Sequence, residues 1–314
     1  MEKIPLIVIA GPTASGKTAL SIDIAKEYNG EIVSADSMQI YKYLNIGTAK
    51  PDMEERSGII HHMMDIVEPT EGYSVADYVK TAHEVIKNIR EKNKNAVVTG
   101  GTGLYITSLV NDVDFREDDS ETELRKSLQK LYEEKGIDYM VEMLSQFDPI
   151  SAQRLHKNNT RRIIRAIEFY KMTGVPISKH QEETKKKESR YYPCMMAIKW
   201  EMDKLYERIE KRVDIMIESG LIEEVENLCG KGYTKQLLSM QGIGYKEIID
   251  YFNGECTKDE AIEKIKLSTR HYAKRQMTWF RRDERIHWIN SGENIKEQAE
   301  KILSEYHYKK CSEK

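Results

Sequence analysis

Cysteine is scarce in this sequence, and long apolar runs are missing. The four cysteines, Cys194, Cys229, Cys256 and Cys311, lie at least 27 positions apart and form no CxxC pair. This spacing supports neither a zinc site nor a disulfide framework. No apolar run approaches the roughly 18 residues of a membrane-spanning helix, and the N-terminus lacks the basic start and apolar core of a signal peptide. We therefore expect a cytoplasmic protein with reduced thiols and no membrane association.

A strong excess of charge of one sign is also missing. The 49 Lys and Arg against 52 Asp and Glu give a formal net charge of −3, which argues against a uniformly basic nucleic-acid binder. Residues 154–190 nevertheless hold 11 basic against 4 acidic side chains. A local basic surface is therefore compatible with the slightly acidic chain, because electrostatic attraction depends on where the charge lies.

Strands and helices alternate in the first third of the chain. Short apolar runs at residues 6–10, 31–35 and 95–99 are separated by helical patterns at residues 18–28 and 74–90. Such alternation indicates parallel strands in a sheet that is covered on both faces. The fold class is therefore α/β.

The pattern becomes helical from about residue 116 to 190, and strand character returns at YYPCMMAIKWE. An all-helical block between α/β segments is typical of an inserted subdomain. We predict a core formed by residues 1–117 and 191–314, with a helical, basic insertion at residues 118–190. Within the insertion, QEETKKKESR is expected to be a mobile charged loop.

A phosphate-binding loop follows the first strand. Residues 11–18 read GPTASGKT and match GxxxxGK[ST], with a strand before and a helix after. The glycines let successive N–H groups face an anion, and the helix N-terminus adds its positive dipole end. Lys17 would bring charge to the terminal phosphates, and the Thr18 hydroxyl would bind Mg²⁺. The core is therefore predicted to be P-loop NTPase-like, a parallel sheet flanked by helices.

The strand-end aspartate that usually serves Mg²⁺ in nucleotide hydrolases and kinases is missing. The apolar strand at residues 96–98 runs into TGGTGLY without a carboxylate, and Asp65 in HHMMDI would be a substitute on a weak strand. A base-recognition NKxD element is also absent. The sequence therefore indicates a loop that binds a diphosphate, in surroundings that are not arranged for ordinary ATP chemistry.

A carboxylate and a hydroxyl are predicted at the ends of the neighbouring strands. Asp36 follows the second strand in EIVSADSMQIYK, and Thr102 follows the third in TGGTGLY. Ligands of doubly wound sheets bind at such strand ends, so both side chains should face the cavity of Lys17 and Thr18. Asp36 could be a general base, a partner of Mg²⁺ or the cap of the next helix. The glycines beside Thr102 would let a substrate approach the main chain closely.

Eight stretches together resemble the tRNA dimethylallyltransferase family, whose members prenylate N6 of adenosine 37 beside the anticodon. They span residues 7–282 in the family's order: GPTASGKTAL, EIVSADSMQIYK, IGTAKP, HHMMDI, VVTGGTGLYI, LHKNNTRRIIRAIE, SMQGIGYKE and STRHYAKRQMTWFRR. The phosphate loop alone is shared by many functions, whereas the whole set is specific. ADSMQIYK and TGGTGLY are the two stretches most specific to the family.

The resemblance implies a reaction between dimethylallyl diphosphate and a tRNA adenosine. Asp36 would be the general base, with Lys17 and Thr18 also catalytic and Mg²⁺ beside Thr18. The diphosphate would be held by Gly11, Pro12, Thr13, Ala14, Ser15, Gly16, Lys17 and Thr18. The tRNA would be contacted by Asp36, Ser37, Met38, Gln39, Thr102, Arg125, Arg154, Lys157, Arg161 and Arg162. The target adenine would be flipped into the cavity, and no protein partner is implied, so we expect a monomer.

Two other functions are compatible with parts of the sequence. A small-molecule or nucleoside kinase would hold ATP in the same loop and use Asp36 to deprotonate a hydroxyl, but the missing strand-end aspartate disfavours it. An RNA-binding protein could retain the loop for folding alone, which the nearby Asp36 and Thr102 disfavour. Without the resemblance, a helix with Arg161, Arg162 and Arg165 would be typical of a solvated face.

Overall fold

The computed structural model describes residues 3–113, 115 and 123–311. They form two compact units, one of Met1–Val110 with Arg190–Lys314 and one of Asn111–Ser189. We call these unit 1 and unit 2. The first predicted domain boundary, between residues 117 and 118, lies outside the described residues. The second unit ends one residue before the end predicted for the insertion.

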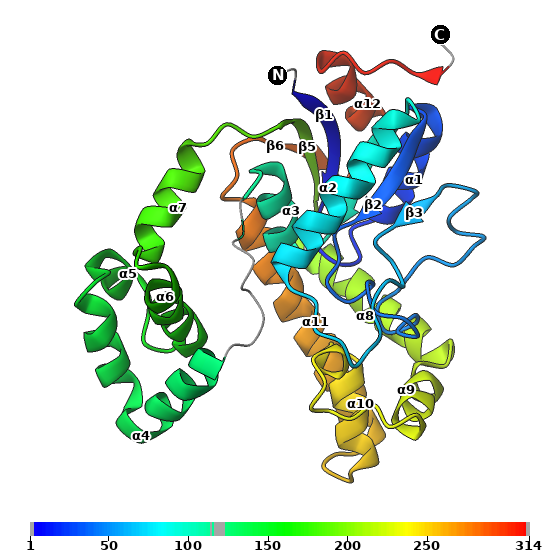
Figure 1. Cartoon of the computed structure of the whole chain (residues 1–314). Helices are drawn as coiled ribbons and strands as arrows, with labels where there is room; N and C mark the ends of the chain where they lie inside the picture. Colours follow the sequence, from blue (N-terminus) through cyan, green and yellow to red (C-terminus); the bar gives the residue numbers. More distant parts are fainter. Residues whose placement is uncertain (1–2, 114, 116–122, 312–314) are drawn as a thin grey trace. The chain divides into compact units, whose positions relative to one another are not determined.

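Unit 1 is built on a parallel sheet, which confirms the predicted α/β class (Figure 1). Within the described residues the sheet has six strands in the order β3-β2-β4-β1-β5-β6. Their bounds are β1 (Ile4–Ala10), β2 (Gly30–Ser34), β3 (His61–His62), β4 (Asn95–Gly100), β5 (Tyr191–Lys199) and β6 (Ile286–Asn290). The central strand β1 pairs with β4 on one side and β5 on the other, so the sheet joins segments from both ends of the chain.

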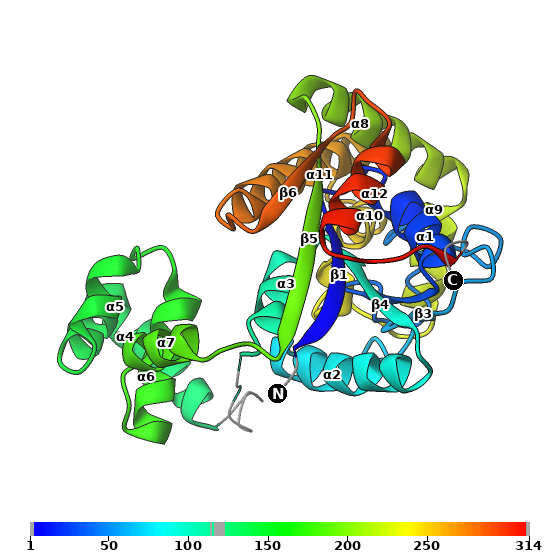
Figure 2. The same ribbon diagram turned by 90° about the horizontal axis from the view of Figure 1, so that it is seen from above.

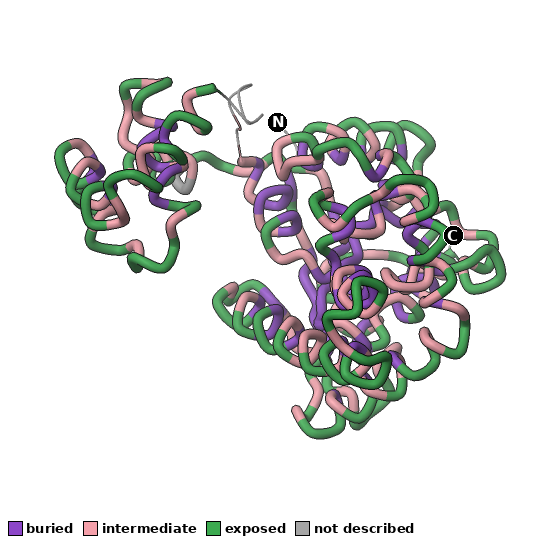
Figure 3. The backbone as a smooth tube through the Cα atoms, turned by 90° about the horizontal axis from the view of Figure 1, so that it is seen from below, coloured by how far each residue is buried: buried purple, intermediate pink, exposed green. Residues whose placement is uncertain are grey.

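Helices cover both faces of this sheet, as its apolar strands require. The side chains of β1 from Leu6 onwards are buried, the pattern of a strand without a solvent-facing side. On one face lie α1 (Lys17–Glu27) and α12 (Ile295–Glu305), and on the other lie α2 (Val75–Glu91) and α3 (Gly103–Val110). Figure 2 shows these pairs on opposite sides of β1 and β5. Burial is concentrated between the layers (Figure 3).

A helical cap lies beyond the carboxyl ends of the strands (Figure 1). It consists of α8 (Met202–Glu218), α9 (Leu221–Gly230), the short 3₁₀ helix η1 (Ser239–Gln241), α10 (Tyr245–Phe252) and α11 (Lys258–Phe280). A capping box of Thr257 and Glu260 begins α11. The cap and the segment that follows β2 share an apolar core centred on Tyr41 and Tyr245, so the cap is fixed over the strand ends.

Unit 2 is all-helical in its described residues. It contains α4 (Glu123–Ser145), α5 (Pro149–Arg154), α6 (Thr160–Thr173) and α7 (Ile177–Lys186) around an apolar core. Gly136, with φ 78°, interrupts α4. The expectation of a loop from residue 181 is wrong as far as residue 186, because α7 continues through it.

Candidate active site

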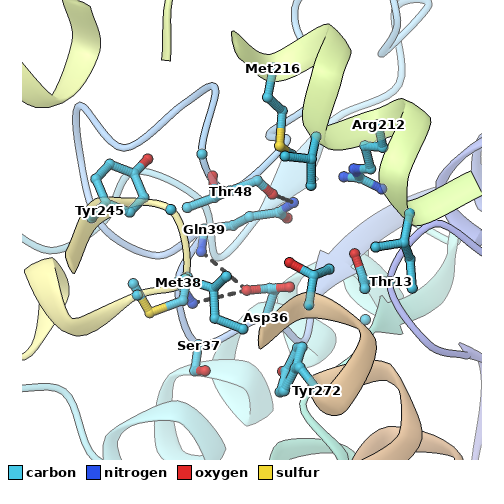
Figure 4. A pocket seen from close by; sticks show the side chains of 18 of the residues that line it. Thr13, Asp36, Ser37, Met38, Gln39, Thr48, Arg212, Met216, Tyr245 and Tyr272 are labelled. Carbon is cyan, nitrogen blue, oxygen red and sulfur yellow. Dashed lines mark hydrogen bonds between the residues drawn. The ribbon is translucent and has the colours of Figure 1, made fainter. Parts of the chain in front are cut away.

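A cavity of about 360 Å³ opens at the carboxyl ends of the strands in unit 1. Lys17, Thr18 and Asp36 all line it, so the structure brings the predicted loop and carboxylate together. The helical cap supplies the opposite wall. The residues of the cap that line the cavity include Ile209, Arg212, Val213, Met216, Leu221, Tyr245, Ile265, Tyr272, Arg275 and Gln276. Figure 4 shows polar groups around Asp36 and the thioether of Met216 on the cap side.

The phosphate loop ends in a left-handed turn at Gly16, with φ 90°, directly before α1. The main-chain N–H of Thr13 donates to Gln276 Oε1 at 2.9 Å, and both residues line the cavity. Lys17 Nζ donates to Pro12 O at 3.3 Å. The Ser15 hydroxyl oxygen is buried and has no hydrogen-bond partner among the described residues. An orphaned polar atom inside the loop fits a site that binds a polar ligand.

Two cations converge on this part of the cavity. Burial lowers the pKa of Lys17 to about 8, the charge of Arg212 acts in the same direction, and Asp36 opposes them. Burial also lowers the pKa of Arg212, while the charges of Asp36 and Glu55 raise it. Partly desolvated cations held close together favour an anionic ligand, which would relieve their repulsion.

Arg212 is a candidate functional residue that sequence reasoning missed, because it lines the cavity. It lies on α8, and 195 positions separate it from Lys17 in the sequence. The arginine occurs in a charged helical stretch, KRVDIMIE, without a motif that would single it out.

The two oxygens of Asp36 have different surroundings. Its Oδ1 accepts the main-chain N–H groups of Met38 at 2.9 Å and Gln39 at 3.3 Å (Figure 4). The capping interpretation is therefore correct for this oxygen, although a turn follows and not a helix. Its Oδ2 makes no hydrogen bond within the described part of the chain. One oxygen fixes the carboxylate, and the other is available to a proton or a metal ion.

Thr102 connects the third strand end to this turn. Its Oγ1 accepts the N–H of Ser37 at 3.0 Å and donates to Ser37 Oγ at 3.3 Å. Tyr272 of α11 lines the cavity beside them. Burial and the charge of Asp36 raise its pKa to about 12, although a hydrogen bond with Thr102 acts in the opposite direction. The Tyr272 hydroxyl is therefore neutral and can act as a donor.

Two of the glycines beside Thr102 allow close packing, and Gly100 also lines the cavity. That they let a substrate approach the main chain stays a prediction. A Cβ on Gly100 would lie 2.2 Å from Ala35 O, and one on Gly101 would lie 2.1 Å from Gln276 Nε2. Neither contact is tolerable. The two residues let β2 and α11 approach the strand end closely.

The IGTAKP stretch forms a wall of the cavity and is anchored by Glu224 of α9. The Glu224 carboxylate accepts the N–H groups of Asn45, Ile46 and Gly47 at 2.9 to 3.2 Å. The Tyr245 hydroxyl donates to it at 2.7 Å. Four donors therefore hold this carboxylate.

Two further side chains tie the same wall to its surroundings. Gln39 Nε2 donates to Thr48 O at 3.2 Å, so this predicted tRNA-contact residue also fixes the wall. Lys50 Nζ donates to Asp65 Oδ1 at 2.6 Å. Asp65 is thus paired with a lysine and does not line the cavity.

The donor set fits Mg²⁺. No group of three or more His, Cys, Asp or Glu that could hold a metal ion occurs among the described residues. The cavity does offer the Thr18 hydroxyl and Asp36 Oδ2. Mg²⁺ accepts such a sparse set, because it keeps waters and binds through one or two protein oxygens together with substrate phosphates.

The basic side chains predicted to contact tRNA differ in their surroundings within unit 2. Arg125 donates to the buried Glu168 carboxylate at 2.7 and 3.1 Å, so its charge is compensated internally. Arg154 donates to Gln181 at 2.8 Å, and Lys157 pairs with Asp138. The side chains of Arg161 and Arg162 on α6 are exposed, as are those of Arg154 and Lys157, but the first two make no hydrogen bond or ion pair within the described residues. They are the most available cations of this set.

Taken together, the fold and the cavity define a P-loop-like α/β enzyme. None of the described helices is both long and apolar enough to cross a bilayer. The sequence matches the IPP transferase family over residues 39–283. The chain belongs to this family, which confirms the predicted enzyme class of prenyltransferase, and a kinase function is not favoured.

Relatives with nearly the same length support the assignment. The chain is 51% identical to the tRNA dimethylallyltransferase of Acetivibrio thermocellus over 96% of each chain, and 48% identical to that of Clostridioides difficile over 96% and 97%. Its fold is similar to that of the tRNA isopentenylpyrophosphate transferase of Staphylococcus epidermidis, with TM-score 0.72, 40% identity and coverage of 97% and 99%. A eukaryotic dimethylallyltransferase acting on tRNA gives TM-score 0.82 at 30% identity, with 97% of this chain and 77% of that chain covered.

Proposed function

We propose that the protein transfers a dimethylallyl group from dimethylallyl diphosphate to N6 of adenosine 37 in tRNA and releases diphosphate. The observation that carries this proposal is the single cavity that joins a phosphate loop and two cations to a carboxylate with one uncommitted oxygen. The relatives named tRNA dimethylallyltransferase supply the substrate classes. A cytoplasmic location and a monomeric state remain predictions.

In the proposed reaction, N6 of the adenine attacks C1 of the dimethylallyl group as the C1–O bond to diphosphate breaks. Asp36 Oδ2 accepts the proton that N6 loses, while Oδ1 stays bonded to the turn and keeps the carboxylate oriented. Such a base typically contributes about 10²–10⁴-fold to a rate. Lys17 and Arg212 stabilise the negative charge that grows on the leaving diphosphate. Mg²⁺, held by Thr18, would neutralise part of the same charge.

The apolar side chains of the cavity have a matching task. Val213, Met216 and Leu221 of the cap line it together with the polar groups. An apolar wall of this kind favours the prenyl tail and excludes water, which would otherwise compete with N6 for C1. Exposed cations of unit 2, Arg161 and Arg162, would bind phosphates of the anticodon arm.

The decisive experiment is a transfer assay with labelled dimethylallyl diphosphate, Mg²⁺ and unmodified tRNA that carries A36-A37. We expect the label on N6 of adenosine 37 and no label on the same tRNA with guanosine at position 37. If no prenyl group is transferred and the protein instead moves the γ-phosphate of ATP to an acceptor, the proposal is wrong.

A further inference from the structure

Two side chains hold the phosphate loop by its carbonyl groups. Trp200, directly after β5, donates its indole N–H to Ser15 O at 3.0 Å. Arg208, on α8, donates its Nε–H to Ala14 O at 2.9 Å. The Arg208 guanidinium lies 4.4 Å from the centre of the Trp200 ring, so the two side chains also support each other. We call this pair the carbonyl anchor.

The anchor determines which way the next two N–H groups point. In a planar trans peptide the C=O and the following N–H point in opposite directions, and the described chain contains no cis peptide bond. If Ala14 O and Ser15 O are held by the anchor, the N–H groups of Ser15 and Gly16 point the other way. The Ser15 N–H makes a long bond of 3.3 Å to Pro12 O, and the Gly16 N–H has no partner in the described chain.

The backbone conformation of Ala14 requires stabilisation by its surroundings. Ala14 has φ 61°, a left-handed conformation that costs a non-glycine residue free energy unless its surroundings enforce it. The methyl group of Ala14 is buried in a small cluster with Leu205 and Ile209 of α8. Packing of the side chain and the bond to its carbonyl therefore act together on this one residue.

We propose that Trp200 and Arg208 are positioning residues for the leaving group: they hold the Ala14 and Ser15 carbonyls outward so that the N–H groups of Ser15 and Gly16 face the diphosphate. This inference rests on the proposed function. Neither side chain touches the substrate, so the anchor acts through the orientation of the loop. The carbonyl anchor contributes to binding of the prenyl donor and to stabilisation of the departing diphosphate, and it does not contribute to binding of tRNA.

The test is the affinity for inorganic diphosphate with Mg²⁺, measured by calorimetry on the full chain. Trp200→Phe removes the indole N–H but keeps a ring beneath Arg208. Because a hydrogen bond contributes about 0.5–1.5 kcal/mol, we expect the Kd for diphosphate to rise roughly 2–10-fold. The KM for dimethylallyl diphosphate should rise with it, while the Kd for tRNA stays unchanged. Arg208→Lys, which keeps the charge but not the planar donor, should act in the same direction.

Trp279→Phe is the matched control. It removes another indole N–H bond of unit 1, from Trp279 to Thr107 Oγ1 at 3.1 Å, on a side chain that does not line the cavity. Diphosphate affinity should not change in this variant. The anchor proposal is wrong if Trp200→Phe and Arg208→Lys both bind diphosphate as tightly as the wild type. It is also wrong if Trp279→Phe weakens diphosphate equally, or if tRNA affinity falls in parallel.

Failure of the proposed function has a different signature. In that case the wild-type protein itself would neither bind Mg²⁺-diphosphate nor transfer a prenyl group, and both proposals would be overturned together. Binding and transfer by the wild type with unaltered variants would overturn the anchor alone.

Discussion

The charge of Lys17 depends on pH within the range of an activity assay, because burial and Arg212 lower its pKa to about 8. Below this pKa the ammonium attracts the diphosphate, and above it the attraction is lost. We therefore predict that kcat/KM for dimethylallyl diphosphate falls as pH rises through about 8, since this ratio reports the free enzyme. The break in kcat should lie at higher pH, because a bound diphosphate stabilises the charged lysine.

Lys17→Arg provides the test of this assignment, because an arginine stays protonated throughout the range. Its activity is expected to be lower, but the break near pH 8 should disappear from the kcat/KM profile. If the break persists in Lys17→Arg, another group titrates there.

Asp36→Asn separates the two tasks of the Asp36 carboxylate. The amide oxygen can still accept the N–H groups of Met38 and Gln39, so the turn is retained. A neutral amide cannot accept the proton from N6, and we predict a fall of about 10²–10⁴-fold in the single-turnover rate. The donor Kd should change only slightly. A loss of donor affinity as large as the loss of rate would assign Asp36 to Mg²⁺ binding.

At the scale of single residues, the sequence reveals groups that belong to local motifs. Lys17, Thr18 and Asp36 follow strands at fixed positions, so pattern and spacing suffice to bring them together. Gln276 is different, because its bond to Thr13 joins residues 263 positions apart. Gln276 is buried on α11, and the sequence around it carries no information about its partner. Arg212 and the carbonyl anchor cannot be recognised from the sequence for the same reason, because their partners lie far away in the chain.

Among the elements, the two-residue edge strand β3 depends on one buried carboxylate. Glu31 of β2 accepts bonds from His62 Nε2 at 2.7 Å and Lys94 Nζ at 2.8 Å. Burial alone would raise the pKa of Glu31, but these hydrogen bonds and the charge of Lys92 outweigh burial and hold the pKa at about 2. The carboxylate therefore joins β3 and the start of β4 to β2.

We predict that Glu31→Gln lowers the free energy of unfolding at pH 7 by roughly 2–4 kcal/mol. The folded pKa lies below the ordinary value of 4.5, so the stabilisation is present above pH 4.5 and is lost as pH falls towards 2. In urea unfolding followed by circular dichroism, the difference in free energy of unfolding between variant and wild type should become smaller as pH falls from 4.5 towards 2. Glu68→Gln, in an exposed pair with Lys42, should cost at most about 1 kcal/mol.

Long elements with strong patterns are the ones that the sequence predicts. The strands β1, β2, β4 and β5 and the helices α1 and α2 follow from apolar runs and helical spacing. The strand β3 is too short to produce a pattern, and its pairing depends on Glu31. The strand β6 has a mixed sequence, IHWIN, and becomes a strand by adding to the edge of β5. Tertiary contacts decide such elements.

For the whole molecule, the uneven distribution of charge predicts that unit 2 makes a salt-dependent contribution to tRNA binding. Replacing Arg161 and Arg162 by glutamine should weaken tRNA binding and reduce the slope of log K against log salt by roughly 1.4–1.8. The KM for dimethylallyl diphosphate should not change. The control is a variant with Lys87→Gln and Lys301→Gln, two exposed cations of unit 1. If the slope falls as much in this control, charge in general and not the surface of α6 is responsible.

Unit 1 is discontinuous in sequence, and this has a consequence for synthesis of the protein. The phosphate loop is made among the first 18 residues, whereas Trp200, Arg208 and Gln276 emerge only after all of unit 2. At about 5–20 residues per second, the ribosome leaves an interval on the order of ten seconds or more. During this time the nascent chain carries the motif without its support. Unit 2, whose helices make local contacts, can fold in that interval, so the first segment of the chain to be translated acquires its binding shape among the last.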